Sequence, residues 1–204
     1  MTTLQPSMPY VAPTRCGMPV LAGLDRNLRA NMLLSLVFRG NALPTDYATR
    51  AMVSTYVRVT ERAVEEYEMA RAQFTEFTHR PSNGHFFSLF RASDHLESCI
   101  SQVDRACNFL RAMPKRAELA GLIPDLAVMI KANRQRIAIL RNATEHLETR
   151  LVKGNISEGD YVMLCLGEDS CELERQSISY EELASWLTEM HSLASGLASE
   201  GTVR

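Results

Sequence analysis

Apolar residues recur every three or four positions over three long stretches of the chain, and this periodicity predicts amphipathic helices. The helices are expected over about 46–77, 85–112 and 125–152. Short breaks containing proline or glycine separate them, which favours an antiparallel helical bundle. The positions expected in the core are Val53, Tyr56, Thr60, Val64, Tyr67, Phe74 and Phe77 in the first helix; Phe86, Leu89, Phe90, Leu96, Ile100, Val103, Cys107 and Leu110 in the second; and Leu126, Ile130, Asn133, Ile137, Leu140, Thr144, Leu147 and Leu151 in the third.

Both ends of the chain depart from this pattern. Four prolines within residues 1–20 predict an extended arm, and a short helix is expected over 24–38. Further on, 161–166 and 171–178 should form a β-hairpin around the four-residue loop Gly167–Ser170. A last helix should begin near Ser179, which has capping-box spacing with Glu182. The predicted class is mainly α: an N-terminal arm and short helix (1–44), a helical bundle (45–153), and a β-hairpin plus C-terminal helix packed on the bundle (154–204).

The third helix has two sides that lack acidic residues. Opposite Leu140 lies an outer face without any Asp or Glu, which ends with Asn142 and His146. A helix that only covers a core usually exposes charged residues on its outer side. We therefore expect another segment of the chain, or a second copy of the protein, to pack there, and a symmetric copy would bring two His146 side chains together. The residues of this candidate dimer face are Val128, Ala132, Gln135 and Ile139.

Composition narrows the classes of function only slightly. The 204 residues carry a net charge of −2, which does not favour a general nucleic-acid coat protein. Residues 131–153 differ from the rest, with six cationic and two acidic side chains. Such a local basic patch could bind a phosphate ligand. It is equally typical of a solvated face whose cationic residues pair with acidic neighbours.

The cysteines and the apolar segments indicate in which compartment the protein works and whether it binds a metal or cofactor. Five cysteines form no C-x-x-C pair and no metal-ligand spacing with histidine, so a reduced, cytoplasmic setting is expected, without a metal or cofactor. The first 20 residues contain no apolar stretch of the kind found in secretory signals. The run at 32–38 is too short to span a bilayer, so no membrane association is expected.

The segment "RNATEH" near the end of the third helix resembles the motif of the HEPN superfamily, the higher eukaryotes and prokaryotes nucleotide-binding domain. Arg141, Asn142 and His146 match its pattern of arginine, polar residue and spaced histidine. The resemblance covers the helices from about 46 to 152. It implies a metal-independent, homodimeric endoribonuclease of the toxin or stress-defence type, with RNA as substrate and an antitoxin or regulatory protein as partner.

The chemistry of the three motif residues is compatible with that implication. An imidazole can accept a proton from a ribose 2′-OH, and a guanidinium can stabilise charge on the phosphate. Asn142 is four residues from His146 and neighbours it on the helix, whereas Arg141 is five residues away and points elsewhere. Convergence on one phosphate therefore needs a reach across the helix or the copy in a partner subunit. Glu97 and Glu145 are candidate supporting carboxylates.

A second interpretation of the same residues involves no catalysis. Arg141 and Glu145 have the spacing of an ordinary ion pair on a helix surface. His146 has the position of a surface or interface histidine. The protein would then be a helical-bundle protein that binds a partner or a nucleotide through the same helix face.

Overall fold

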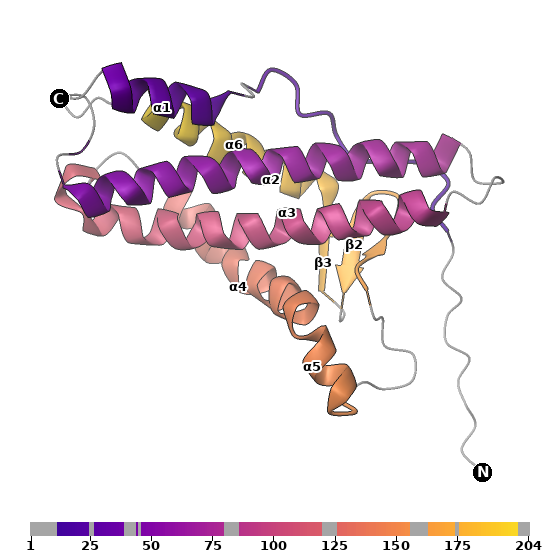
Figure 1. Ribbon diagram of the computed structural model, residues 1–204. Coiled ribbons are helices and arrows are strands. Elements are labelled where there is room, and N and C mark those ends of the chain that lie inside the picture. The colour runs from indigo at the N-terminus through magenta and orange to yellow at the C-terminus, as the bar shows by residue number, and fades with distance from the viewer. Residues whose placement is uncertain are drawn as a thin grey trace, which may run out of the picture.

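The computed structural model describes residues 12–24, 27–38, 44, 46–79, 86–119, 126–155, 163–173 and 176–199. The protein is mainly α, with a small antiparallel sheet and a C-terminal helix (Figure 1). No helix in these ranges is long and apolar enough to cross a membrane. The helices are α1 (Leu28–Phe38), α2 (Tyr47–His79), α3 (Phe86–Ala112), α4 (Leu126–Glu145), α5 (Leu147–Val152) and α6 (Tyr180–Ser199), and two 3-10 turns, Met113–Lys115 and Ala117–Leu119, follow α3.

Helices α2 and α3 lie side by side along the length of the molecule and form its centre (Figure 1). The carboxylate of Asp46 caps α2 by accepting hydrogen bonds from the backbone N–H and the hydroxyl of Thr49, at 2.8 and 2.7 Å. Every residue expected on the core side of the first predicted helix is buried. The sequence prediction of these two helices is confirmed to within a few residues.

The prediction of the core face was wrong at the start of α3. Phe86 and Phe90 were expected inside, but their side chains are 53% and 46% exposed. Phe87 is 75% exposed beside them, whereas Leu89 and Leu96 are buried as expected. Ser88 and Leu89 in the same turns are buried, so the start of α3 is covered on its Leu89 side, and Phe86 and Phe90 lie outside that covered side.

Helix α6 is part of the main packing, since it contacts both α1 and α2. The Ser179 hydroxyl accepts the Glu182 N–H at 3.2 Å, which confirms the predicted N-cap. The Tyr56 hydroxyl donates to the Met190 carbonyl at 2.9 Å and joins α2 to α6. The ring of Tyr180 meets Phe74 edge-on, with centroids 6.2 Å apart. Buried residues from α1, α2, α3 and α6 belong to one hydrophobic core.

The sheet has three strands, β1 (Cys165–Leu166), β2 (Ser170–Leu173) and β3 (Gln176–Ser179), in the order β1-β2-β3. Leu166 pairs with Cys171 across the predicted four-residue loop, so the first turn of the hairpin is confirmed. The single strand predicted over 171–178 was wrong, because this segment folds back and pairs antiparallel with itself, as the register of Cys171 with Ile178 shows. Two short antiparallel strands bury Cys171, Leu173 and Ile178 on one side more completely than one exposed strand could.

The N-terminal arm is attached to the first hairpin loop. The Gly17 N–H donates to the Glu168 carbonyl at 2.8 Å. Arg15 forms ion pairs with Glu168 and Asp169 at 3.0 and 2.6 Å. Hydrogen bonds from Thr14 and Arg15 hold the pKa of Glu168 below its ordinary value. Residues 12–20 have no regular secondary structure, so these contacts define their path.

We predict that Gly17→Ala lowers stability, because the added methyl group would collide with the backbone carbonyl of Glu168. The expected loss is about 1–3 kcal/mol, the usual cost of overpacking a tight contact. Gly196→Ala is the matched control, because a methyl group there meets no atom within 4 Å and replaces glycine inside a helix. That control should gain about 0.5–1 kcal/mol. Urea unfolding of the two variants checks both signs, and equal stabilities would contradict the packing described for the arm.

Candidate functional site

The predicted third helix is interrupted at His146. It consists of α4 and α5, and His146 has φ −103° and ψ 6°, outside the helical range. The hydroxyl of Thr144 donates to the Arg141 carbonyl at 2.8 Å. Such side-chain bonds to the preceding turn compete with the backbone ladder and bend helices. The sequence contains no proline or glycine here, so the expectation of one continuous helix over 125–152 was wrong for this local reason.

The break turns α5 away from the bundle (Figure 1). Ile137 and Leu140 of α4 are buried, as the core stripe predicted. Leu151 was expected on the same stripe but is 51% exposed, and Val152 is 88% exposed. The side chains of Leu126, Ile130, Asn133 and Leu147 lie outside the described part. The described core residues therefore hold α4 as far as Leu140, and the exposed residues of α5 do not pack on the core.

Arg141 is held by polar neighbours on two helices. Its Nη2 pairs with the Glu145 carboxylate at 2.6 Å, the i,i+4 pair that the second interpretation expected. Its Nη1 donates to the Asn142 amide oxygen at 3.2 Å, and its Nε lies 4.0 Å from the Asp104 carboxylate of α3. About a third of the side chain remains exposed. The guanidinium is oriented, and it still reaches the surface.

Asn142 and His146 both lie exposed at the end of α4. The backbone N–H of His146 still donates to the Asn142 carbonyl at 3.0 Å, so the two residues stay one turn apart although the helix ends between them. Gln135 and Ile139 on the same side are also exposed, Ile139 by 37%. Of the predicted dimer face, Val128 and Ala132 have side chains outside the described part. No described segment of this chain covers the outer face at Gln135, Ile139, Asn142 and His146.

A buried polar group beneath Arg141 was missed by sequence reasoning. Asp104 is 5% exposed, and its carboxylate accepts a hydrogen bond from Asn108 at 3.3 Å. Asn108 in turn accepts from Arg134 of α4 at 3.2 Å. The one available signal was an acidic residue directly beside the core position Val103. Buried polar groups need partners, and these contacts fix how α4 lies on α3.

Glu97, a candidate supporting carboxylate, has a different role from the expected one. Its Oε1 accepts the Leu164 N–H at 3.1 Å, while the Ser93 hydroxyl donates to the Leu164 carbonyl at 2.7 Å. These two side chains of α3 anchor the chain just before β1. Burial raises the pKa of the Glu97 carboxyl, and the charge of Asp94 adds to that effect. Glu145, the other supporting candidate, is the residue that pairs with Arg141.

The raised pKa of Glu97 gives a pH-dependent prediction. A carboxyl whose folded pKa lies above its unfolded value contributes stability below the unfolded pKa, and that contribution is lost as pH rises through the folded pKa. Glu97→Gln keeps an oxygen for the Leu164 N–H and removes the charge. The variant should melt at a higher temperature than wild type at about pH 8, and the difference should vanish below the unfolded value of about 4.3. A lower melting temperature at the higher pH would contradict this.

The basic segment is partly neutralised by its surroundings. Arg136 pairs with Glu182 of α6, and its guanidinium lies 5.9 Å from the ring centroid of Trp186. Arg134 and Arg141 have the partners described above. Lys153 is exposed at the end of α5. The described arginines of 131–153 therefore pair with acidic or polar neighbours, and Arg141 is the one that belongs to the motif.

The geometry brings a hydrogen-bond donor, an amide and an imidazole to one exposed helix end. A guanidinium can bind a phosphate oxygen, and an imidazole can take up or supply a proton. In the described part, no three His, Cys, Asp or Glu side chains are grouped to share a metal ion. No protein-family model, curated protein or solved structure matches the chain.

Proposed function

We propose that the protein is an endoribonuclease of HEPN type, in which Arg141, Asn142 and His146 act together at the end of α4. The observation that carries the proposal is the helix break at His146, which leaves its imidazole exposed, on the same segment as an Arg141 that Asp104 and Glu145 orient. A toxin or defence role in the cytoplasm, held in check by an antitoxin, is the context in which such an activity makes sense.

The reaction would use the ribose 2′-OH as nucleophile. His146 takes the 2′-OH proton while the 2′ oxygen forms a bond to phosphorus. The bond from phosphorus to the 5′ oxygen breaks, and an imidazolium returns a proton to that oxygen. The products are a 2′,3′-cyclic phosphate and a 5′-OH, and no water is consumed. The guanidinium of Arg141 stabilises the charge on the non-bridging oxygens.

The mechanism needs His146 and an arginine at one phosphate, and it leaves an exposed helix face to be covered. A second copy of the chain would meet both needs. Arg141 points toward α3 and Glu145, whereas His146 is five residues further on and beyond the helix break. The outer face at Gln135 and Ile139 is uncovered in the described chain. A two-fold contact through this face would place His146 of one protomer near Arg141 of its partner, so that one phosphate could touch both.

Ile139→Asp tests the dimer separately from the chemistry. A charge in the centre of an apolar contact costs several kcal/mol unless it is paired, so the variant should be monomeric by light scattering at concentrations where wild type is dimeric. Because Ile139 is partly exposed in the single chain, the fold should persist by circular dichroism. An unchanged dimer would exclude this face as the interface.

The function itself is tested by incubating purified protein with a labelled RNA in excess EDTA. The proposal expects cleavage products that end in a 2′,3′-cyclic phosphate. Intact RNA after incubation with the dimeric protein, or products with 3′-OH ends, would contradict it. EDTA is included because the proposed chemistry needs only protein side chains.

A non-catalytic binding module is the second candidate, and the Arg141–Glu145 pair favours it. An arginine already paired at 2.6 Å must exchange its partner to bind phosphate. In a non-catalytic module, wild type and Glu145→Gln should both leave RNA intact. In the proposed nuclease, Glu145 restrains the catalytic arginine, so wild type should cleave and Glu145→Gln should change the cleavage rate.

A further inference from the structure

Three phenylalanines stand exposed at the first turns of α3. Phe87 is 75% exposed and Phe90 46% exposed. Phe86 is also exposed but packs on Phe77, with ring centroids 5.9 Å apart. Large aromatic side chains in water are unfavourable unless something covers or uses them. Phe87 and Phe90 therefore form an accessible aromatic surface.

An arginine and a histidine continue the same side of the helix. Phe87, Arg91 and His95 follow one another at intervals of four residues, so they lie along one side of α3. In the described chain, no ion pair involves Arg91, although the exposed Asp94 lies three residues away. The guanidinium of Arg91 is therefore available to an external anion next to the two aromatic rings.

His95 is oriented by a buried carboxylate. Its Nδ1 lies 2.6 Å from Oε2 of Glu66 on α2, and the side chain of Glu66 is 4% exposed. The other oxygen of Glu66 pairs with Arg62. In a neutral imidazole, donation from Nδ1–H to the carboxylate leaves the lone pair on Nε2. A quarter of the His95 side chain is exposed. Its Nε2 can accept a hydrogen bond from a hydroxyl group.

We propose that this side of α3, with Phe87, Phe90, Arg91 and His95, binds single-stranded RNA; these four residues are called the α3 strip. The inference rests on the proposed ribonuclease function. Bases stack on the two rings, Arg91 binds a phosphate, and His95 Nε2 accepts a hydrogen bond from a ribose 2′-OH. Stacking on exposed aromatic side chains next to cationic groups is how sequence-tolerant single-strand binding is achieved, and the 2′-OH is what distinguishes RNA from DNA.

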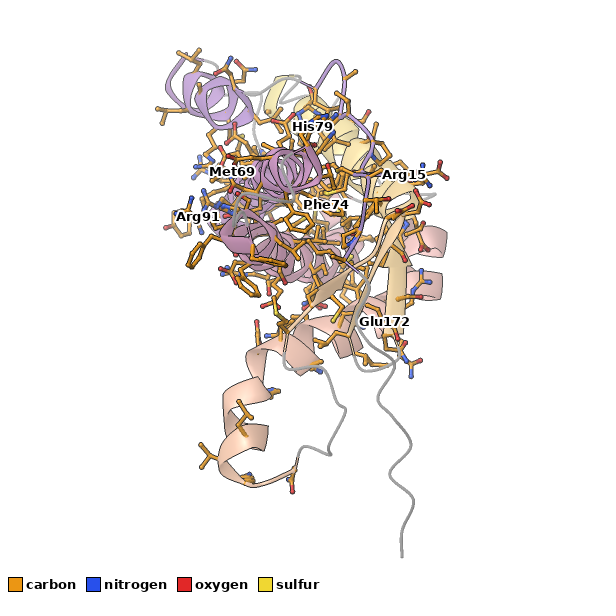
Figure 2. The ribbon with its side chains drawn as sticks, turned by 90° about the vertical axis from the view of Figure 1, so that its right-hand side faces the viewer. Arg15, Met69, Phe74, His79, Arg91 and Glu172 are labelled. Carbon is orange, nitrogen blue, oxygen red and sulfur yellow. The ribbon has the colours of Figure 1, made fainter. Side chains whose placement is uncertain are left out.

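The position of the α3 strip suits delivery of RNA to His146. Arg134 of α4 contacts Asn108 of α3, and Arg141 further along α4 approaches Asp104, which comes earlier in α3. Helix α4 thus runs toward the end of α3 that carries the phenylalanines. Figure 2 shows Arg91 and Met69 of α2 on the left of the helical layer, away from Arg15 and the sheet on the right, with α4 and α5 below that layer.

The test measures fluorescence anisotropy of a labelled 12-nucleotide oligouridylate and its deoxy counterpart. All variants carry His146→Ala, so that the probe is not cut. Phe87→Ser should weaken RNA binding by about 5- to 150-fold, the usual worth of one stacked base. His95→Ala should weaken RNA binding and leave DNA binding within two-fold, because DNA lacks the 2′-OH. Asp94→Asn should strengthen the binding of both RNA and DNA, because it removes a negative charge.

Tyr47→Ser and Arg111→Ala are matched controls, because both residues are exposed at the opposite end of the α2–α3 pair.

The outcomes separate this inference from the proposed function. RNA binding that Phe87→Ser and Arg91→Ala leave unchanged overturns the α3 strip even if wild type cleaves RNA. Strip-dependent binding by a protein that never cleaves supports the strip and contradicts the nuclease. A change of oligomeric state in Phe87→Ser without any RNA binding overturns the inference and assigns the aromatic surface to self-association. Folding of each variant is checked by its melting temperature.

Discussion

His146→Ala should lower the rate of RNA cleavage by about 10²- to 10⁴-fold, the usual contribution of a positioned acid or base. Among the described side chains at this helix end, the imidazole is the one suited to take and return a proton. Because the side chain is exposed and lies at a break between two helices, its removal should leave the melting temperature unchanged. Initial rates on a fluorogenic RNA in EDTA measure the effect.

The control for this substitution is His79→Ala, an exposed histidine at the end of α2. It removes an imidazole of similar exposure from a position remote from Arg141 along the chain, and cleavage should continue at the wild-type rate. A His146→Ala rate within two-fold of wild type would assign any observed nuclease activity to other residues, and the motif would lose its catalytic role.

Leu140→Ala should produce the largest loss of stability among the α4 substitutions. Leu140 is fully buried in the contact of α4 with the bundle. Truncating a buried leucine to alanine costs about 2–5 kcal/mol. In a chain of this size, that cost corresponds to a fall of roughly 4–20 °C in melting temperature. Cleavage should also fall, because α4 carries Arg141 and His146 and its position on α3 depends on this contact.

The neighbouring residue provides the control for Leu140. Ile139 is 37% exposed and lies about 100° around α4 from Leu140, so Ile139→Ala should cost about 1 kcal/mol or less in the monomer. Equal losses for the two variants, measured by urea unfolding at a concentration that keeps the protein monomeric, would show that α4 does not pack on its Leu140 side.

Much of the architecture was predictable because its signals are local. The long apolar stripe of α2, from Val53 to Phe77, predicted a helix and its buried side. Ser179 and Glu182 predicted the start of α6 from cap spacing, although the Glu182 carboxylate pairs with Arg136. The loop between Leu166 and Cys171 followed from two β-type segments around four polar or small residues. These features depend on a few neighbouring residues.

The features that the sequence did not predict depend on contacts that apolar periodicity does not describe. The break at His146 comes without proline or glycine, next to a Thr144 hydroxyl that bonds to the preceding turn. Phe86 and Phe90 are exposed although Leu89 between them is buried, because the covered side of α3 is narrower than its apolar stripe. The strand over 171–178 divides in two because its residues pair with each other.

The sequence predicted which residues belong to the candidate site, but not their partners on other helices. Spacing gave both the motif of Arg141, Asn142 and His146 and the ion pair of Arg141 with Glu145. The contribution of Asp104 depends on how α4 crosses α3, and Glu97 turned out to hold Leu164. A residue's chemistry can be inferred from the sequence, but its partner on another helix cannot.

The most direct test of the central claim compares cell growth after induction of wild type and of His146→Ala at matched expression. The proposed nuclease predicts growth arrest by wild type alone, accompanied by RNA fragments with cyclic phosphate ends. Equal arrest by both proteins would contradict the account, because the protein would then act on cells without the imidazole that the mechanism requires.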